Sequence, residues 1–300
     1  MLGGLLSEGL GYPVGPSHKL IQPAYDNEKG FYELLPFVLQ NDDIMRAQVR
    51  DYGNVENYDM SQSMLDALSA GTRLNPDGSD WMRSKATAKH PHPIDFKKGE
   101  DGLSILSKHD VWMQKDPRMC VTLPSYFPFF KKPPAVVFTY RDPLEVAMSM
   151  NKRDPKIFSI QRVLRLWLLY NKYALTSSEG LCTVYTSSRR VMEDPFAEVE
   201  RVGKELGEAC KAVPIKVLDR AVVDDFVDPN LVHNKHKKTT NEEAKVEGMR
   251  NCQWPKWEST VEGEKGRMSE EKLYAKAMQV YCDLESGLVF EDVRGYDWPA

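Results

Sequence analysis

The sequence predicts an α/β fold with a central parallel sheet flanked by helices, and three observations lead to this prediction. An unbroken β-prone run at 135–140 is typical of a buried parallel strand. Amphipathic helical stretches alternate with such runs along the chain, which favours a parallel sheet because helices join parallel strands. The 300 residues, 41% of them hydrophobic, can bury the large core that this arrangement requires.

Helical periodicity predicts most of the other elements. Leu2, Leu5, Leu6 and Leu10 fall on one face of a helix at the start of the chain. The further stretches with this period, each predicted as a helix, are 34–45, 61–70, 159–178 and 269–286. In the last of these we expect four residues to face inward, namely Leu273, Ala277, Val280 and Leu284. We expect Gly287 to end the last of these helices, because glycine is the usual residue just past a helix C-terminus.

Local sequence signals add two strands and one helix to the predicted order. Short β-prone runs at 110–114 and 181–186 are predicted as core strands beside the central one. Asp194 and Pro195 predict the start of another helix, because Asp is a good N-cap and Pro suits the first helical position.

Two long segments carry few signals for a helix or a strand. The segments 71–102 and 241–267 are rich in Gly, Pro, Lys and Glu, and we predict that they form mobile surface loops. In folds of this class such loops are natural lids over a ligand. We expect residues 1–300 to form one domain around the predicted sheet.

The most informative stretch follows the central strand. The strand ends on Arg141, and Asp142 with Pro143 predicts a helix N-terminus immediately after it. Free backbone amides, the positive end of a helix dipole and a guanidinium would meet there, which predicts an anion site. Ser149 lies on the helical side that faces back toward this anion. The alternative is that Arg141 pairs with Glu145 and that Ser149 is an ordinary helix serine.

Four segments, in order along the chain, resemble the signature of the sulfotransferase family, in the branch best known from bacterial genomes. The segments are Asn27-Glu28-Lys29-Gly30-Phe31-Tyr32-Glu33, Lys115-Asp116-Pro117-Arg118, Arg141 with Ser149 eight positions later, and Trp167 with Tyr170. The resemblance spans most of the chain, from about residue 1 to about residue 240. It implies a sulfotransferase-like relative of the P-loop nucleotide-binding folds.

The resemblance also implies a donor and the residues that bind it. The donor of this family is 3′-phosphoadenosine 5′-phosphosulfate, and Arg141 and Ser149 would hold its 3′-phosphate. A basic cluster at 233–238 lies roughly where cytosolic members bind the same phosphate, so we include Lys235 and Lys237 among the donor-binding candidates. The alternative for this cluster is a solvated lysine run beside a loop.

The catalytic candidates come from two of the resembling segments. Lys115 would stabilise the transferring group, as a cation at the carboxyl edge of the sheet. By counting, Pro117 occupies the position of the usual catalytic histidine, so we expect Asp116, and as a second candidate Glu33, to take the acceptor proton. The alternative is that Asp116 caps a turn before Pro117 and pairs with Arg118.

One part of the family pattern is missing from the sequence. Sulfotransferases open with a strand and a loop of the type Pro-Arg/Lys-Ser-Gly-Thr, which holds the 5′-phosphosulfate. Here the first six residues already have the pattern of the helix that follows such a loop. We therefore expect a chain whose start was set too late, at an internal Met.

Composition limits the classes of partner and compartment. A net charge of −4 argues against a nucleic-acid-binding protein, and no apolar run is long enough for a membrane span. Five scattered Cys residues show no disulfide or zinc spacing, so the sequence predicts a reducing, cytoplasmic compartment and no bound metal. The expected partner is a small-molecule or glycan acceptor.

These expectations combine into one function and two alternatives. The resemblance implies transfer of a sulfonate from the donor to a hydroxyl, or to an amine, of the acceptor. A non-catalytic protein of the same fold that lacks the 5′-phosphate loop is the first alternative. A nucleotide-dependent phosphotransferase is the second, although the sequence contains no Gly-Lys-Ser/Thr loop of the Walker type.

Overall fold

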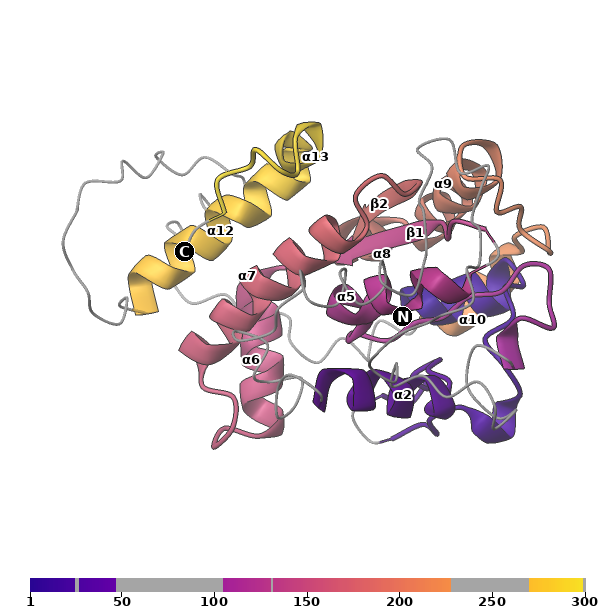
Figure 1. The fold of residues 1–300 in the computed structure, drawn as a ribbon, viewed down its shortest axis with the longest axis horizontal. Helices are drawn as coiled ribbons and strands as arrows, with labels where there is room; N and C mark the ends of the chain where they lie inside the picture. The colour runs from indigo at the N-terminus through magenta and orange to yellow at the C-terminus, as the bar shows by residue number, and fades with distance from the viewer. Residues whose placement is uncertain (25–26, 47–104, 131, 228–269, 299–300) are drawn as a thin grey trace. The chain divides into compact units, whose positions relative to one another are not determined.

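The computed structural model describes residues 1–24, 27–46, 105–130, 132–227 and 270–298, and within them it has many helices and a small parallel sheet of two strands (Figure 1). This agrees with the predicted α/β class in its coarse form. The chain divides into two compact units, a first of Met1–Thr139 with Tyr173–Asp228 and a second of Tyr140–Lys172 with Pro229–Ala300. The predictions for 61–70, 71–102, 233–238 and 241–267 lie outside the described residues.

The helical elements agree with most of the predicted stretches. In chain order they are α1 (Leu2–Gly4), η1 (Leu5–Gly9), η2 (Ser17–Lys19), α2 (Leu35–Arg46), α5 (Met119–Thr122), η5 (Leu123–Phe129), α6 (Pro143–Arg153), α7 (Ile160–Ser177), α8 (Ser188–Glu193), α9 (Pro195–Glu208), α10 (Arg220–Phe226), α12 (Glu270–Ser286) and α13 (Leu288–Glu291). The Asp194 carboxylate accepts a hydrogen bond from the amide of Ala197, so the predicted cap of α9 is confirmed. Gly287 has a φ of 85° at the end of α12, as its position predicted.

The sheet confirms two of the three predicted strands. β1 (Val136–Tyr140) lies beside β2 (Thr183–Ser187), and the amide of Val136 donates to the carbonyl of Cys182 at 2.8 Å. Side chains of a strand alternate between its two faces. In agreement, Ala135 and Val137 pack against one hydrophobic cluster and Val136 against another. β1 is therefore covered on both faces, as an unbroken apolar run predicts.

The prediction of a third strand, at 110–114, is wrong. This segment is not a strand in the structure, although the amide of Met113 donates to the carbonyl of Pro13 at 2.8 Å. Proline has no amide hydrogen, so Pro13 cannot return a bond to this segment and continue a ladder. The segment instead leads, without regular structure, to Lys115 and the turn before α5.

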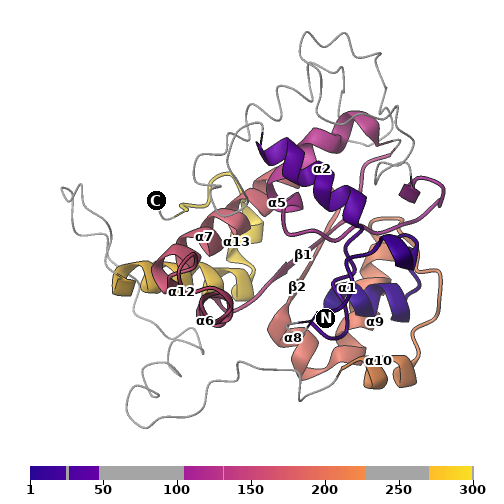
Figure 2. The same ribbon diagram turned by 90° about the horizontal axis from the view of Figure 1, so that it is seen from below.

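Two hydrophobic clusters form the core of the first unit. The first cluster gathers around η1, β2, α9 and α10 and consists of Leu5, Leu6, Leu10, Tyr12, Val184, Val191, Val199, Val202, Leu206, Val223 and Phe226. The second consists of Leu34, Phe37, Ile44, Leu106, Leu123, Tyr126, Phe127 and Phe130. Figure 2 shows η1, which directly follows α1, beside α9 and α10. The predicted apolar face of the first helix is thus confirmed as part of the core.

In the second unit α12 packs against α6 and α13 (Figure 2). The four residues predicted to face inward on α12 are buried, namely Leu273, Ala277, Val280 and Leu284. The Tyr140 hydroxyl, at the end of β1, donates to the carbonyl of Leu284 at 3.1 Å. This bond fixes the last residue of the strand against α12.

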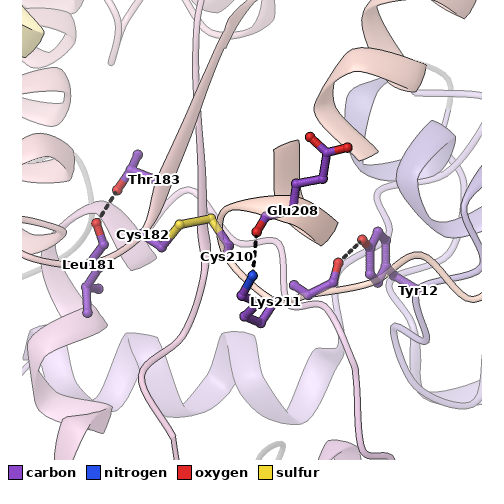
Figure 3. Close-up of a disulfide and its surroundings, with 8 residues drawn as sticks. Tyr12, Leu181, Cys182, Thr183, Glu208, Cys210 and Lys211 are labelled. Atoms are coloured by element: carbon purple, nitrogen blue, oxygen red, sulfur yellow. Dashed lines mark hydrogen bonds between the residues drawn. A yellow bond between two sulfur atoms is a disulfide. The ribbon is translucent and has the colours of Figure 1, made fainter. Parts of the chain in front are cut away.

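The prediction that the Cys residues form no disulfide is wrong. Cys182, just before β2, is bonded to Cys210, just after α9 (Figure 3), and Cys282 is also in a disulfide. The first pair is 28 residues apart in the sequence, but its Cα atoms are 5.4 Å apart. Because this closeness comes from packing, linear spacing could not indicate it. The cysteines therefore no longer support a reducing compartment.

Within the described residues, no helix combines the length and apolarity needed to cross a membrane.

Candidate functional site

Lys115 and Glu33, two of the predicted catalytic residues, form an ion pair in the first unit. Glu33 precedes α2, and its backbone carbonyl accepts a hydrogen bond from the amide of Ile21 at 2.8 Å. The Glu33 side chain is 8% exposed, whereas that of Lys115 is 41% exposed. The pair thus joins a buried carboxylate to an ammonium group that solvent can reach.

The electrostatic surroundings of Glu33 favour its protonated form. Burial raises the pKa of the Glu33 carboxyl above its usual value, and the Lys115 ammonium offsets only part of this rise. The nearby Asp116 raises the pKa further, while Arg118 acts in the opposite direction. A carboxyl of this kind binds and releases protons closer to neutral pH than an exposed glutamate does.

Asp116, the first candidate for the base, is held by three hydrogen bonds. Its Oδ2 accepts from the amide nitrogen of Asn41 at 2.8 Å, and its Oδ1 accepts from the backbone amide and from a guanidinium nitrogen of Arg118, both at 2.9 Å. The side chain is fully buried. Arg118 also donates to Asp42 at 2.6 Å. These are the contacts expected if Asp116 caps the turn and pairs with Arg118.

Asn41 is a buried residue of this region that our sequence reasoning missed. Its side-chain oxygen accepts hydrogen bonds from the hydroxyls of Thr122 and Tyr126, at 2.7 and 2.8 Å. With the bond to Asp116, it therefore links α2 to α5 and η5. A signal was present in the sequence, because Asn41 falls at helical spacing from Leu34 and Phe37, on the apolar face of the predicted helix.

The first residues of the chain lie beside Lys115. A Cβ placed on Gly3 would be 3.5 Å from Cγ of Lys115. Burial, and then the charge of Lys115, lower the pKa of the Met1 amino group. Three segments therefore meet at this place in the first unit, namely residues 1–4, Tyr32 with Glu33, and 115–118.

Arg141 lies at the end of β1 in the second unit, as predicted. The indole nitrogen of Trp167 on α7 donates to the Arg141 carbonyl at 2.9 Å, which fixes the backbone there. The guanidinium Nε donates to Glu145 at 2.8 Å, and both side chains are about one-third exposed (35% and 30%). The contact is the one described in our alternative for Arg141, and exposure leaves it open to competition from a stronger anion.

The helix N-terminus beside Arg141 differs from the expectation in one respect. The Asp142 carboxylate caps α6 and accepts hydrogen bonds from the amides of Leu144 and Glu145, at 2.8 and 3.0 Å. Pro143 has no amide hydrogen. The prediction of free amides is therefore wrong, because the Asp142 cap itself uses them.

The remaining predicted donor-binding residues are Ser149, Lys235 and Lys237. Ser149 is partly buried on α6, two helical turns beyond Arg141. Lys235 and Lys237 lie outside the described residues. In the described part of the chain, no three His, Cys, Asp or Glu side chains are grouped closely enough to hold a metal ion.

Comparison with known proteins identifies no relative of this chain. The chain matches no family model, no curated protein and no solved structure.

Proposed function

We propose that this protein transfers a sulfonate group from 3′-phosphoadenosine 5′-phosphosulfate to a hydroxyl, or to an amine, of an acceptor. The observation that carries the proposal is the Lys115–Glu33 pair, which combines an accessible cation with a carboxylate of raised pKa. In the reaction the acceptor oxygen forms a bond to sulfur, and the bond from sulfur to the 5′-phosphate oxygen breaks. The acceptor proton goes to a base, and 3′-phosphoadenosine 5′-phosphate leaves.

Lys115 is suited to stabilise the charge of the transferring group. Its ammonium has three hydrogen-bond donors, and the pair with Glu33 leaves others for a ligand. Group transfer of this type depends mainly on placement and electrostatics, so a cation beside the reacting oxygens provides much of the effect.

Glu33 is a better candidate for the base than Asp116. Asp116 is fully buried and its two oxygens already accept three hydrogen bonds, so neither oxygen is available to an acceptor hydroxyl. Glu33 has a raised pKa, which a general base needs in order to work near neutral pH. We therefore assign Asp116 to hold the turn and Glu33 to take the acceptor proton.

Arg141 is proposed to hold the 3′-phosphate, together with Ser149. A phosphate carries more charge than the Glu145 carboxylate, and it can accept two parallel hydrogen bonds from a guanidinium. It can therefore displace that carboxylate. The cap by Asp142 and the bond from Trp167 keep the Arg141 backbone in place for this exchange.

The proposal is tested by titrating 3′-phosphoadenosine 5′-phosphate into the protein by calorimetry. We expect binding that the Arg141→Gln variant weakens by about tenfold or more, through the loss of a charge-assisted contact. Lys115→Gln should weaken binding of the sulfonated donor more than binding of this product, because its assigned partner is the transferring group.

Matched control variants exist in the chain. Arg189 pairs with Glu193 at 2.8 Å across one helical turn, in the same way that Arg141 pairs with Glu145, so Arg189→Gln should leave nucleotide affinity unchanged. The exposed Lys108 gives the control for Lys115. A folded wild-type protein that does not bind the nucleotide would refute the proposal and favour a non-catalytic protein. Transfer of phosphate from ATP, tested in parallel, would favour a phosphotransferase.

A further inference from the structure

A pocket of about 520 Å³ opens on the first unit, and its lining includes Tyr32, the residue just before Glu33. Its lining includes Lys29 and Tyr32 from the segment before α2, Glu8 from η1, and Asp225 and Phe226 from α10. Tyr32 directly precedes Glu33, and a Cβ on Gly3 would lie 3.9 Å from Cβ of Tyr32 and 3.5 Å from Cγ of Lys115. Tyr32 therefore connects the lining of the pocket to the segment that carries the ion pair.

Two aromatic rings form the apolar part of the pocket. The rings of Tyr32 and Phe226 pack at 5.9 Å between centroids, and Phe226 is almost fully buried whereas Tyr32 is partly exposed. Gly4 allows this packing, since a Cβ there would lie 2.1 Å from Cζ of Phe226 and 2.7 Å from Cε2 of Tyr32. The Tyr32 ring is thus a supported surface on which a ligand can stack.

The Tyr32 backbone is held in a conformation that a side chain rarely adopts. Its φ is 55°, in the left-handed region, and the neighbouring Gly30 has a φ of 88°. Backbone hydrogen bonds from Gly30 to Asn27 and from Ile21 to Glu33 hold the segment on both sides of Tyr32. Such strain persists only where the surrounding structure supports it.

The polar part of the pocket combines two carboxylates with one ammonium. The Tyr32 hydroxyl donates to the Glu8 carboxylate at 3.4 Å, and the Lys29 ammonium donates to the Asp225 carbonyl at 3.0 Å. Burial, and then Glu8, raise the pKa of Tyr32 to about 12, so its hydroxyl remains a donor at neutral pH. The free oxygens of Glu8 and Asp225 can accept hydrogen bonds from a ligand.

We propose that this pocket binds the acceptor, and that the acceptor is a neutral carbohydrate whose ring stacks on Tyr32 while its hydroxyls donate to Glu8 and Asp225. The role as acceptor rests on the proposed sulfonate transfer. An apolar acceptor would remove water from the remaining oxygens of Glu8 and Asp225 without offering them a hydrogen-bond donor. An anionic acceptor would meet two carboxylates against one ammonium. A neutral polyhydroxylated ring satisfies both the aromatic and the polar groups.

Saturation-transfer NMR on the full chain tests the inference. The probes are methyl β-D-glucopyranoside, the anionic glucuronate as its charged counterpart, and cyclohexanol as an apolar counterpart. Ala221→Arg fills the pocket from an exposed position of α10, and Asp224→Arg places the same side chain on the same helix away from the lining. Circular dichroism checks that both variants are folded.

We expect signal on the ring protons of the glucoside, lost in Ala221→Arg and kept in Asp224→Arg, and weaker or absent signal for glucuronate and cyclohexanol. Glu8→Gln should reduce the glucoside signal without unfolding the protein. No signal for the glucoside with the wild type, signal that persists in Ala221→Arg, or a preference for cyclohexanol would each overturn the assignment.

Nucleotide binding, measured separately, distinguishes this inference from the proposed function. If the glucoside binds in the pocket and 3′-phosphoadenosine 5′-phosphate does not bind, the pocket is a carbohydrate site and sulfonate transfer is refuted. If the nucleotide binds and the glucoside does not, the proposed function stands and the acceptor class is wrong.

Discussion

At the scale of single residues, the candidate site combines two carboxylates with different surroundings. Asp116 is buried and accepts hydrogen bonds from Asn41 and Arg118, whereas Glu33 pairs with the partly exposed Lys115. Both groups are carboxylates, so their different proposed roles follow from their surroundings. Asp116 holds a turn, and Glu33 is the proposed base. The resemblance named both residues, and the tertiary contacts give them different assignments.

We predict that Glu33 makes the protein less stable as the pH rises. Its pKa in the folded state is raised, so the folded state binds this proton more tightly than the unfolded state. The resulting stability is complete below the unfolded pKa and is lost as the pH rises through the folded pKa. Urea unfolding at a series of pH values should show this slope in the wild type and a smaller slope in Glu33→Gln. The exposed Glu28→Gln serves as the control. Equal slopes in all three proteins would contradict the assignment.

Asn41→Leu should destabilise the protein by about 3 kcal/mol. The change keeps a similar volume but removes the side-chain hydrogen bonds from Asn41 to the buried hydroxyls of Thr122 and Tyr126 and to one oxygen of Asp116. Leu39→Ala, at an exposed position of the same helix, should cost much less. Denaturant unfolding measures both changes, and similar losses would show that the buried contacts contribute little.

At the scale of elements, the strand–turn–helix of β1 and α6 is built from local signals. Asp142 caps the helix with two amide hydrogen bonds, and Pro143 occupies the first helical position. Trp167 and Tyr140 then tie the end of the strand to α7 and α12. The Asp142 cap also uses the amides that an anion would need, so the proposed phosphate contact rests on the Arg141 side chain.

Asp142→Ala should lower the free energy of unfolding by about 1 kcal/mol, the usual cost of losing an N-cap. Asp142→Asn should retain most of the stability, because Asn also accepts the capping hydrogen bonds. The two variants are compared by denaturant unfolding. If Asn is as costly as Ala, the carboxylate acts through its charge and not as a cap.

At the scale of the whole molecule, a disulfide joins two segments that are distant in the sequence. Cys182–Cys210 joins the start of β2 to the end of α9 within the first unit, beside the bond from the Tyr12 hydroxyl to the Ala212 carbonyl (Figure 3). Cys282, on α12, is also disulfide-bonded. Such bonds persist in oxidising surroundings, so the redox state of the preparation is expected to affect stability.

Replacing Cys182 and Cys210 by Ser should destabilise the protein by about 3.6 kcal/mol, the amount expected for a bridge that closes a loop of this size. A reductant should lower the melting temperature of the wild type by more than that of the double variant. Alkylation of the denatured, unreduced protein should modify Cys120, which is a free thiol in the described part of the chain, and spare Cys182 and Cys210. Alkylation of all three would contradict the assigned bond.

The sequence by itself determined the features that depend on neighbouring residues. The β1 strand, the caps at Asp142 and Asp194 and the inward face of α12 were all predicted, because period and capping chemistry act within a few residues. Lys115, Glu33 and Arg141 were named from motifs before their contacts were known.

Only the tertiary structure decided which of these residues meet. Lys115 reaches Glu33 across 82 positions of the sequence, and Cys182 reaches Cys210 across 28. The segment 110–114 has the pattern of a strand but faces Pro13, which cannot complete a ladder. Local patterns set the tendency of each segment to be a helix or a strand. The pairing of a segment depends on which distant segment packs beside it, and a local sequence pattern does not identify that partner.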